Sequence, residues 1–189
     1  MKFLRLLVDA GLRVRERFQL NQAPEKPLHD ALKKYFKWTM QDSKLINKQH
    51  IPVLAITCAK KGESVASLIG RCTDRLHDLG SQYREMWSID GKGAKGEEEG
   101  VQHYSHELPT IFGIVITYSV VGFLTYDARY PGKAVRSMGN WDFSIDGQDV
   151  WHAFAVAIFM ICARNYLMGL EEEGLLGAEI EDDSDDPDA

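Results

Sequence analysis

Charged residues that could act on a phosphate ester directly follow a long apolar run. Residues 51–59 are mostly aliphatic, and they lead into Lys60, Lys61 and Glu63. A carboxylate can hold a divalent cation, and a lysine beside it can lie against the attacked phosphate. Because a hard cation needs several oxygen ligands, a single carboxylate would bind it weakly. These residue types suit metal-dependent cleavage of a phosphodiester, but one carboxylate is an incomplete set of ligands.

The same residues have a structural interpretation. Neighbouring side chains of an extended chain point to opposite sides, so only one of Lys60 and Lys61 can face a site. Ser64 comes directly before an amphipathic stretch, where a serine side chain commonly caps a helix. In this interpretation the turn starts a helix and the two lysines are surface charges.

Eight elements must position these residues. Residues 51–59 lack polar alternation, which is typical of a strand buried on both faces. Apolar residues at helical spacing and short β-rich runs place the other elements. The predicted helices are 2–20, 29–40, 64–87 and 150–170, and the predicted strands are 51–59, 109–118, 120–126 and 141–144. We expect residues 127–139 to be a loop and the last helix to be largely buried.

These elements are predicted to form one domain. The chain has 189 residues, 44% hydrophobic and 26% charged, which is enough for one core. We assign residues 1–170 to a single α/β domain, with N-terminal helices in residues 1–40 and helices packed on a small mixed sheet. Residues 89–102, rich in Gly, Lys and Glu, are expected to be a mobile loop. Residues 171–189 hold ten acids and no base and are expected to be a disordered acidic tail.

Positive charge is concentrated in the N-terminal third. Residues 1–61 hold 13 Lys and Arg against 5 Asp and Glu, although the whole chain has a net charge of −6. Such a surface can attract phosphate, and the acidic tail could screen it. Tyr35, Phe36 and Trp38 lie among the lysines and could stack on bases, or they could simply face the core. The candidate lysines here are Lys33, Lys34, Lys37, Lys44 and Lys48.

Cysteine usage and targeting features point to a reducing compartment. Cys58, Cys72 and Cys162 have no paired spacing and lie in apolar surroundings, as expected of reduced thiols. The N-terminus lacks an uninterrupted apolar segment with a cleavage site. Neither of the longest apolar runs reaches the roughly 18 residues of a spanning helix. We therefore expect an intracellular protein, nuclear or cytoplasmic, that does not enter a membrane.

The histidines give little support to a metal or cofactor. His103 and His106 are three residues apart and could chelate zinc if the segment were helical. No further Cys or His nearby completes a set of four ligands. His152 begins the last helix among apolar residues and is expected to be a satisfied core histidine. No cofactor is expected.

The order of several motifs resembles a known family. The motifs are ITCAKKG at 56–62, LIGR at 68–71, PTIFGIV at 109–115 and VGFLTYD at 121–127. From about Asp42 to Leu170 the chain resembles the PD-(D/E)XK nuclease-like domains common in fungal proteins, including those found ahead of fungal-type protein kinase domains. That family has a strand ending in Glu-x-Lys, a helix with Ile-Gly-Gln and a later Pro-x-x-Phe-Gly strand. The resemblance implies a PD-(D/E)XK-like core.

The catalytic positions of this family differ in the present chain. Asp42 lies fifteen residues before Thr57 and stands where the family has a metal-binding Asp. Thr57 takes the place of the second carboxylate and Ala59 that of the lysine, while Arg71 replaces the helix glutamine. The resemblance therefore implies a degenerate active site.

Three functions remain open. We favour a non-catalytic nuclease-fold binding module that contacts protein or nucleic acid through its basic N-terminal third. The first alternative is a nuclease that uses Asp42, Glu63 and Lys60, with Mg²⁺ held by Asp42. The second is a subunit of a larger complex, docked through the N-terminal amphipathic helix. The sequence does not define the oligomeric state. The residues assigned to nucleic-acid binding are Lys33, Lys34, Lys37, Lys44, Lys48, Lys61 and Arg71.

Overall fold

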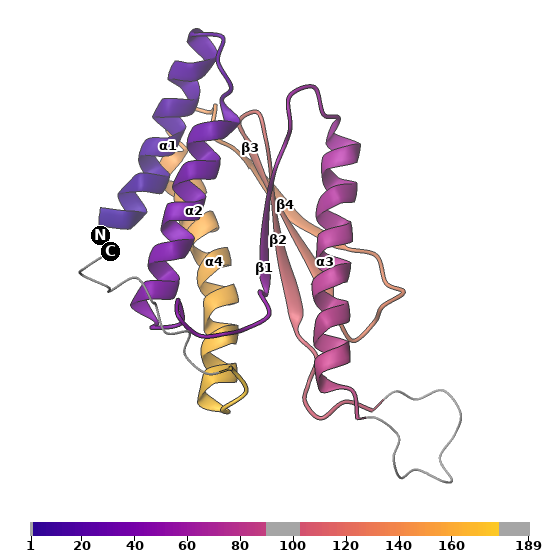
Figure 1. Ribbon diagram of the computed structural model, residues 1–189. Coiled ribbons are helices and arrows are strands. Elements are labelled where there is room, and N and C mark those ends of the chain that lie inside the picture. Colours follow the sequence, from indigo (N-terminus) through magenta and orange to yellow (C-terminus); the bar gives the residue numbers. More distant parts are fainter. Residues whose placement is uncertain (1, 90–102, 178–189) are drawn as a thin grey trace, which may run out of the picture.

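The described part of the chain folds into four helices and one four-stranded sheet (Figure 1). The computed structural model describes residues 2–89 and 103–177. This arrangement confirms the predicted α/β class with helices packed on a small mixed sheet. The helices are α1 (Lys2–Gln19), α2 (Glu25–Asp42), α3 (Val65–Trp87) and α4 (Asp149–Glu172), and the strands are β1 (Leu54–Cys58), β2 (Thr110–Thr117), β3 (Val120–Asp127) and β4 (Arg136–Asp142).

The sheet has the strand order β1-β2-β3-β4. β1 runs parallel to β2, with Ile56 opposite Ile114, whereas β3 is antiparallel to both β2 and β4. A parallel pair needs a crossover connection, which includes α3, while the antiparallel pair β2-β3 needs only a tight turn. Figure 1 shows α3 on one face of the sheet and α1, α2 and α4 in a layer on the other.

α3 approaches the sheet closely because β2 contains a glycine. The buried side of α3 includes Leu68, Cys72 and Leu76. A Cβ atom on Gly113 would lie 3.0 Å from Leu76 Cδ1 and 3.2 Å from Cys72 Sγ. The missing side chain therefore leaves room for the helix, which is a common role of glycine inside a strand.

α4 packs on the opposite face through aromatic rings. The ring of Phe159 stacks on Phe123 of β3, with centroids 4.1 Å apart, and meets Phe112 of β2 edge-on at 5.2 Å. α1 lies against α2 and α4, with Leu7 and Val14 fully buried. The N-terminal helix is therefore part of the core of the domain.

An ion pair joins α1 to α4. The Arg15 guanidinium donates two hydrogen bonds to the Asp149 carboxylate, of 2.9 and 2.8 Å. About a fifth of each side chain is exposed, 21% and 17%. Gly11 makes room for this contact, because a Cβ atom there would lie 2.6 Å from Asp149 Cγ. The position of α1 thus depends on a glycine inside a helix, where glycine is normally unfavourable.

α2 begins earlier than the sequence predicted. We expected the helix to start at residue 29, after two prolines, but it starts at Glu25 with Pro24 at the N-cap. Pro27 lies in the first turn, where a backbone N–H has no partner within the helix. The missing N–H of proline is therefore tolerated there, and proline did not mark a helix boundary.

Two expectations in the C-terminal half are wrong. The expected loop at 127–139 ends early, because β4 already begins at Arg136, opposite Thr125. Its polar sequence is that of a partly exposed edge strand. Residues 174–177 are ordered, since the Gly177 N–H donates to the Gln49 carbonyl at 2.9 Å and residues 175 and 176 pack against the core. Residues 90–102 of the expected mobile loop and 178–189 of the expected tail lie outside the described residues.

Replacing Gly11 by Ala is expected to destabilise the fold. An alanine normally stabilises a helix interior relative to glycine by about 0.5–1 kcal/mol. At position 11 the new methyl group would displace the Asp149 carboxylate and weaken its pairing with Arg15. The substitution is therefore expected to destabilise the protein and to lower the free energy of unfolding by about 1–3 kcal/mol.

The matched control is Gly70→Ala in α3, where a Cβ atom would have no neighbour within 4 Å. Urea titration of both variants measures the free energy of unfolding, which should rise by about 0.5–1 kcal/mol in this control. If Gly11→Ala were as stabilising as Gly70→Ala, the Gly11–Asp149 contact would not matter to the fold.

Candidate functional site

The candidate site lies at the carboxyl end of β1, where the chain turns into α3. In open α/β sheets this end of the strands is the usual place for a ligand. The turn is closed by a hydrogen bond of 3.0 Å from the Glu63 N–H to the Lys60 carbonyl, and Gly62 has a φ of 76°. Ser64 caps α3, as expected, and accepts a hydrogen bond of 3.2 Å from the Ser67 N–H.

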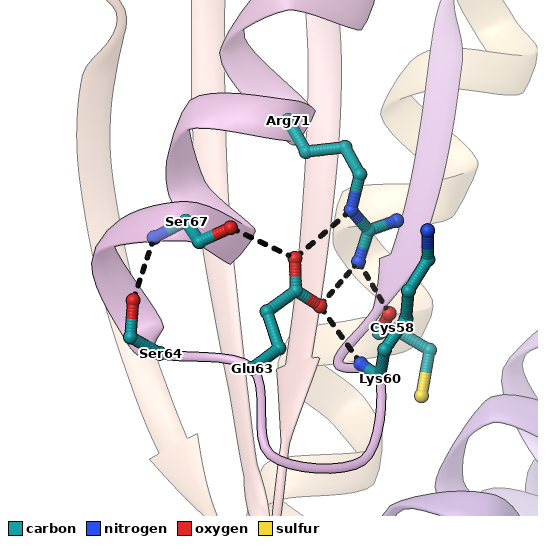
Figure 2. Close-up of polar contacts among 6 residues, drawn as sticks. All are labelled: Cys58, Lys60, Glu63, Ser64, Ser67 and Arg71. Carbon is teal, nitrogen blue, oxygen red and sulfur yellow. Dashed lines mark hydrogen bonds and ion pairs between the residues drawn. The ribbon is translucent and has the colours of Figure 1, made fainter.

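The Glu63 side chain turns back into this turn and is held there (Figure 2). Its Oε2 accepts hydrogen bonds from Arg71 Nη2 at 2.7 Å and from the Lys60 N–H at 2.8 Å. Its Oε1 accepts from Arg71 Nε at 3.1 Å and from the Ser67 hydroxyl at 3.3 Å. Only 9% of the Glu63 side chain is exposed. We call this set of contacts the Glu63–Arg71 clasp.

Arg71 also binds the strand itself. Its Nη2 donates to the carbonyl of Cys58, the last residue of β1, at 2.8 Å. The clasp therefore joins the end of β1, the turn and the second turn of α3. The Arg71 hydrogen bonds and the Lys60 N–H hold the pKa of the Glu63 carboxyl near 2, below its usual 4.5, and the carboxylate in turn raises the pKa of Arg71.

The clasp leaves Glu63 poorly suited to a metal ion. An ionised carboxylate offers about four acceptor positions, and Glu63 already receives four hydrogen bonds. A divalent cation would have to displace Arg71. Nor do the described residues contain a group of three or more His, Cys, Asp or Glu side chains placed to hold one.

The structure does not bring Asp42 to this site. Asp42 is the last residue of α2, and this end of α2 lies at the end of the domain where β1 starts, whereas Glu63 follows the other end of β1 (Figure 1). The five residues of β1 separate the two ends by roughly 13 Å. Asp42 instead lies 3.6 Å from Arg164 of α4. The three residues of the nuclease alternative, Asp42, Glu63 and Lys60, are thus not assembled into one group.

The two positions where the family resemblance expects an acid and a lysine carry no ionisable group. Thr57 is buried. The backbone N–H of Ala59 donates to the Ile116 carbonyl at 2.8 Å. Lys60 and Lys61 are both exposed on the turn and border a pocket of ≈ 430 Å³ with Gly62 and Tyr118.

The lysines assigned to nucleic-acid binding fall into separate places. Lys33, Lys34 and Lys37 lie on the exposed side of α2, and we call them the lysine face. Lys44 is exposed in the turn after α2. Lys48 forms an ion pair of 3.1 Å with Glu171, while Lys61 and Arg71 belong to the other end of β1.

The aromatic residues among these lysines face the core. Tyr35 is 3% exposed, and Phe36 packs against the core. Trp38 stacks on Phe3 of α1, with ring centroids 5.0 Å apart. They are therefore not free to stack on bases, and the core interpretation of their spacing is correct.

The histidines of the described residues do not form a metal site. His106 lies 5.5 Å from the Trp87 ring and 2.9 Å from the Ser105 hydroxyl. His152 is buried beside Phe143, and burial lowers its pKa. Its Nδ1 has no hydrogen-bond partner among the described residues, so the expected core histidine is buried but this nitrogen is not satisfied.

The sequence failed to locate an exposed apolar stripe on α4. We expected this helix to be largely buried, but Trp151, Phe154 and Ile158 are 72%, 42% and 61% exposed, and Cys162 is exposed in line with them. We call these four residues the α4 stripe. By length and composition alone, α4 could cross a membrane, and 39% of its most apolar window is buried in the fold. The helix is apolar on every side, so its sequence does not show which side the fold leaves uncovered.

No family model matches the chain, and neither does any curated protein or solved structure.

Replacing Glu63 by Gln is expected to lower stability at neutral pH and to have little effect in acid. The Glu63 pKa is lower in the folded chain, about 2 against 4.5, so its contribution is fully present above pH 4.5. That contribution disappears as the pH falls from 4.5 towards about 2. The measurement is urea unfolding of both proteins across this range.

The control is Glu85→Gln, which changes an exposed acid on the same helix. It should unfold like the parent protein throughout. If the difference in the free energy of unfolding between Glu63→Gln and the parent protein stayed constant with pH, the assigned role of the clasp would be contradicted.

Proposed function

We propose that this chain is a non-catalytic binding module with a PD-(D/E)XK-like core. The observation that carries the proposal is the saturation of Glu63. The carboxylate nearest to the usual site of chemistry accepts four hydrogen bonds within the protein, two of them from an arginine that also holds β1. A group held in this way positions a strand and a helix instead of binding a catalytic metal.

The arrangement of elements supports the core assignment. A buried strand leads through a turn into a long amphipathic helix, and a hairpin follows in the same sheet. Thr57 and Ala59 stand where the resemblance expects a metal-binding acid and a lysine. A chain with this order of elements and neutral residues at these two positions fits a nuclease-like domain that has lost its chemistry.

The lysine face is the surface that we propose contacts the partner. Its three lysines lie within four residues of one another on one side of α2 and are exposed. Asp30 is also exposed one turn earlier, so the surface carries both signs of charge. Tyr35 and Trp38 are buried or packed, which removes base stacking as a source of affinity. An acidic protein surface suits such a face better than a nucleic acid does.

Millimolar Mg²⁺ or Mn²⁺ is expected to leave the thermal stability of the protein unchanged. A site occupied at 100 times its Kd would add about 2.7 kcal/mol to the free energy of unfolding. Labelled single- and double-stranded DNA and RNA should likewise remain intact with either metal or with EDTA. Metal-dependent cleavage that Asp42→Ala abolishes would overturn the proposal and establish the nuclease alternative.

A triple variant that replaces Lys33, Lys34 and Lys37 by Glu is expected to lose the partner. Co-purification from the native source, quantified by mass spectrometry, measures this loss. Binding through exposed charges should also weaken as salt is raised, because screening acts over about 10 Å at 0.1 M.

The matched control replaces Arg75, Lys133 and Arg136 by Glu, which makes the same change of charge at exposed residues of α3, β4 and the loop before β4. It should retain the partner. Retention by the lysine-face variant, or equal loss by the control, would contradict the assigned surface. Recovery of a nucleic acid in place of a protein would show that the partner is a nucleic acid.

A further inference from the structure

α3 covers only part of the sheet face on which it lies. It packs chiefly on β1 and β2, whereas β3 and β4 continue the sheet beyond it. A pocket of ≈ 450 Å³ lies between α3 and these outer strands. It is lined by α3, by β2, β3 and β4, and by residues 134 and 135 of the loop before β4, and we call it the sheet pocket. Its volume is within the range of about 300–1,000 Å³ that is common for pockets that bind small molecules.

A glycine of β3 forms part of the wall of the sheet pocket. A Cβ atom on Gly122 would meet a single heavy atom within 4 Å, Cγ2 of Val115 in the neighbouring strand, at 2.9 Å. At Gly113 the same test meets Leu76 and Cys72 of α3, so there the helix fills the place of the missing side chain. α3 does not fill that place over Gly122. Glycine inside a strand can mark a point where a ligand approaches the backbone closely.

The sheet pocket is apolar and carries no charge. Val65 and Ile69 of α3 border it and are 53% and 40% exposed, so the fold leaves two large aliphatic side chains uncovered there. The described residues that line it include no Asp, Glu, Lys or Arg. A charged ligand would lose its water without gaining an opposite charge, which is unfavourable. The pocket therefore suits an uncharged and largely apolar molecule.

One polar side chain of the sheet pocket lacks a partner in the fold. His77 lines the pocket, and its ring lies 4.5 Å from the ring of Tyr126. Neither ring nitrogen forms a hydrogen bond among the described residues, and Nε2 is buried. A buried polar group without a partner is rare in folded proteins and needs an explanation. A neutral imidazole has one donor and one acceptor nitrogen, and a hydroxyl group can pair with either.

We propose that the sheet pocket binds an uncharged aromatic molecule that carries a hydroxyl group, and that this hydroxyl pairs with His77. A planar ring can approach the open peptide of Gly122 more closely than a puckered molecule can, and it would cover Val65 and Ile69. Apolar burial would supply most of the affinity, while the hydroxyl would fix the orientation. The pocket and the lysine face lie on opposite sides of the sheet, so this site does not depend on the proposed contact with a partner (Figure 1).

Fluorescence titration of the full chain tests the chemistry of the site. The probe is phenylnaphthylamine, an uncharged aromatic dye whose emission rises in apolar surroundings, at slightly alkaline pH where histidine is ordinarily neutral. The matched probe is anilinonaphthalene sulfonate, which has the same ring system with an added sulfonate. The uncharged dye should bind at least about 10-fold more tightly, because the sulfonate meets no cation in the pocket.

A tryptophan placed at the rim tests the location of the site. Ser137 of β4 lines the pocket and is exposed, so Ser137→Trp can fill the pocket without entering the core. This variant should bind the uncharged dye at least about 10-fold more weakly. The control is Met138→Trp, at a neighbouring residue that is 63% exposed and does not line the pocket, and it should bind like the parent protein. Circular dichroism melting confirms that each variant is folded.

Competition between the dye and two small aromatic compounds tests the role of His77. Naphthalene and naphthol differ by one hydroxyl group, and naphthol should compete about 3- to 10-fold more effectively because of its hydrogen bond. His77→Phe keeps an aromatic ring beside Tyr126 and should make the two compounds equally effective. A purely structural role of His77 would weaken both compounds together and leave their ratio unchanged.

Four results would overturn the proposal. The first is that the uncharged dye does not bind, and the second is that the sulfonate binds equally well. The third is binding that Ser137→Trp leaves intact, which would place the dye elsewhere, for example on the α4 stripe. The fourth is a preference for naphthol that survives in His77→Phe.

Discussion

The return of the chain from β1 to β2 is the constraint on which the fold depends. The two strands are parallel, so the chain must leave the end of β1, travel back along α3 and re-enter the sheet. Arg71 fixes the start of this path, because one guanidinium binds both the Glu63 carboxylate and the Cys58 carbonyl. Gly113 then lets α3 settle on the sheet. The remaining strands extend from β2, so their position follows from the same crossover.

The clasp occupies the carboxyl end of β1, the end of a strand where open α/β sheets commonly bind ligands. A catalytic carboxylate must keep acceptor positions free for a metal ion, because binding the ion compensates for the water that the carboxylate loses. Glu63 uses the same oxygen atoms to join a strand to a helix, and its low pKa reflects hydrogen bonds from Arg71. Stability and metal binding therefore compete for one side chain, and the present contacts favour stability.

The surface that we propose for binding, the lysine face, lies in the helical layer opposite α3. The lysine face of α2 is polar and sensitive to salt, whereas the α4 stripe is apolar and would depend on area. The two surfaces therefore lie on different helices and differ in chemistry.

The sequence by itself determined the elements whose signals are local. Ser64 and the apolar spacing after it predict α3 with its cap, and the uninterrupted apolar run predicts a strand covered on both faces, as β1 is by α2 and α3. The central position expected for this strand was wrong, because β1 lies at the edge of the sheet. Tertiary structure decided what depends on distant residues. The pairing of Glu63 with Arg71, the separation of Asp42 from both and the uncovered side of α4 each follow from how elements pack. Residue type shows that a helix is apolar, but only its neighbours decide which side is covered.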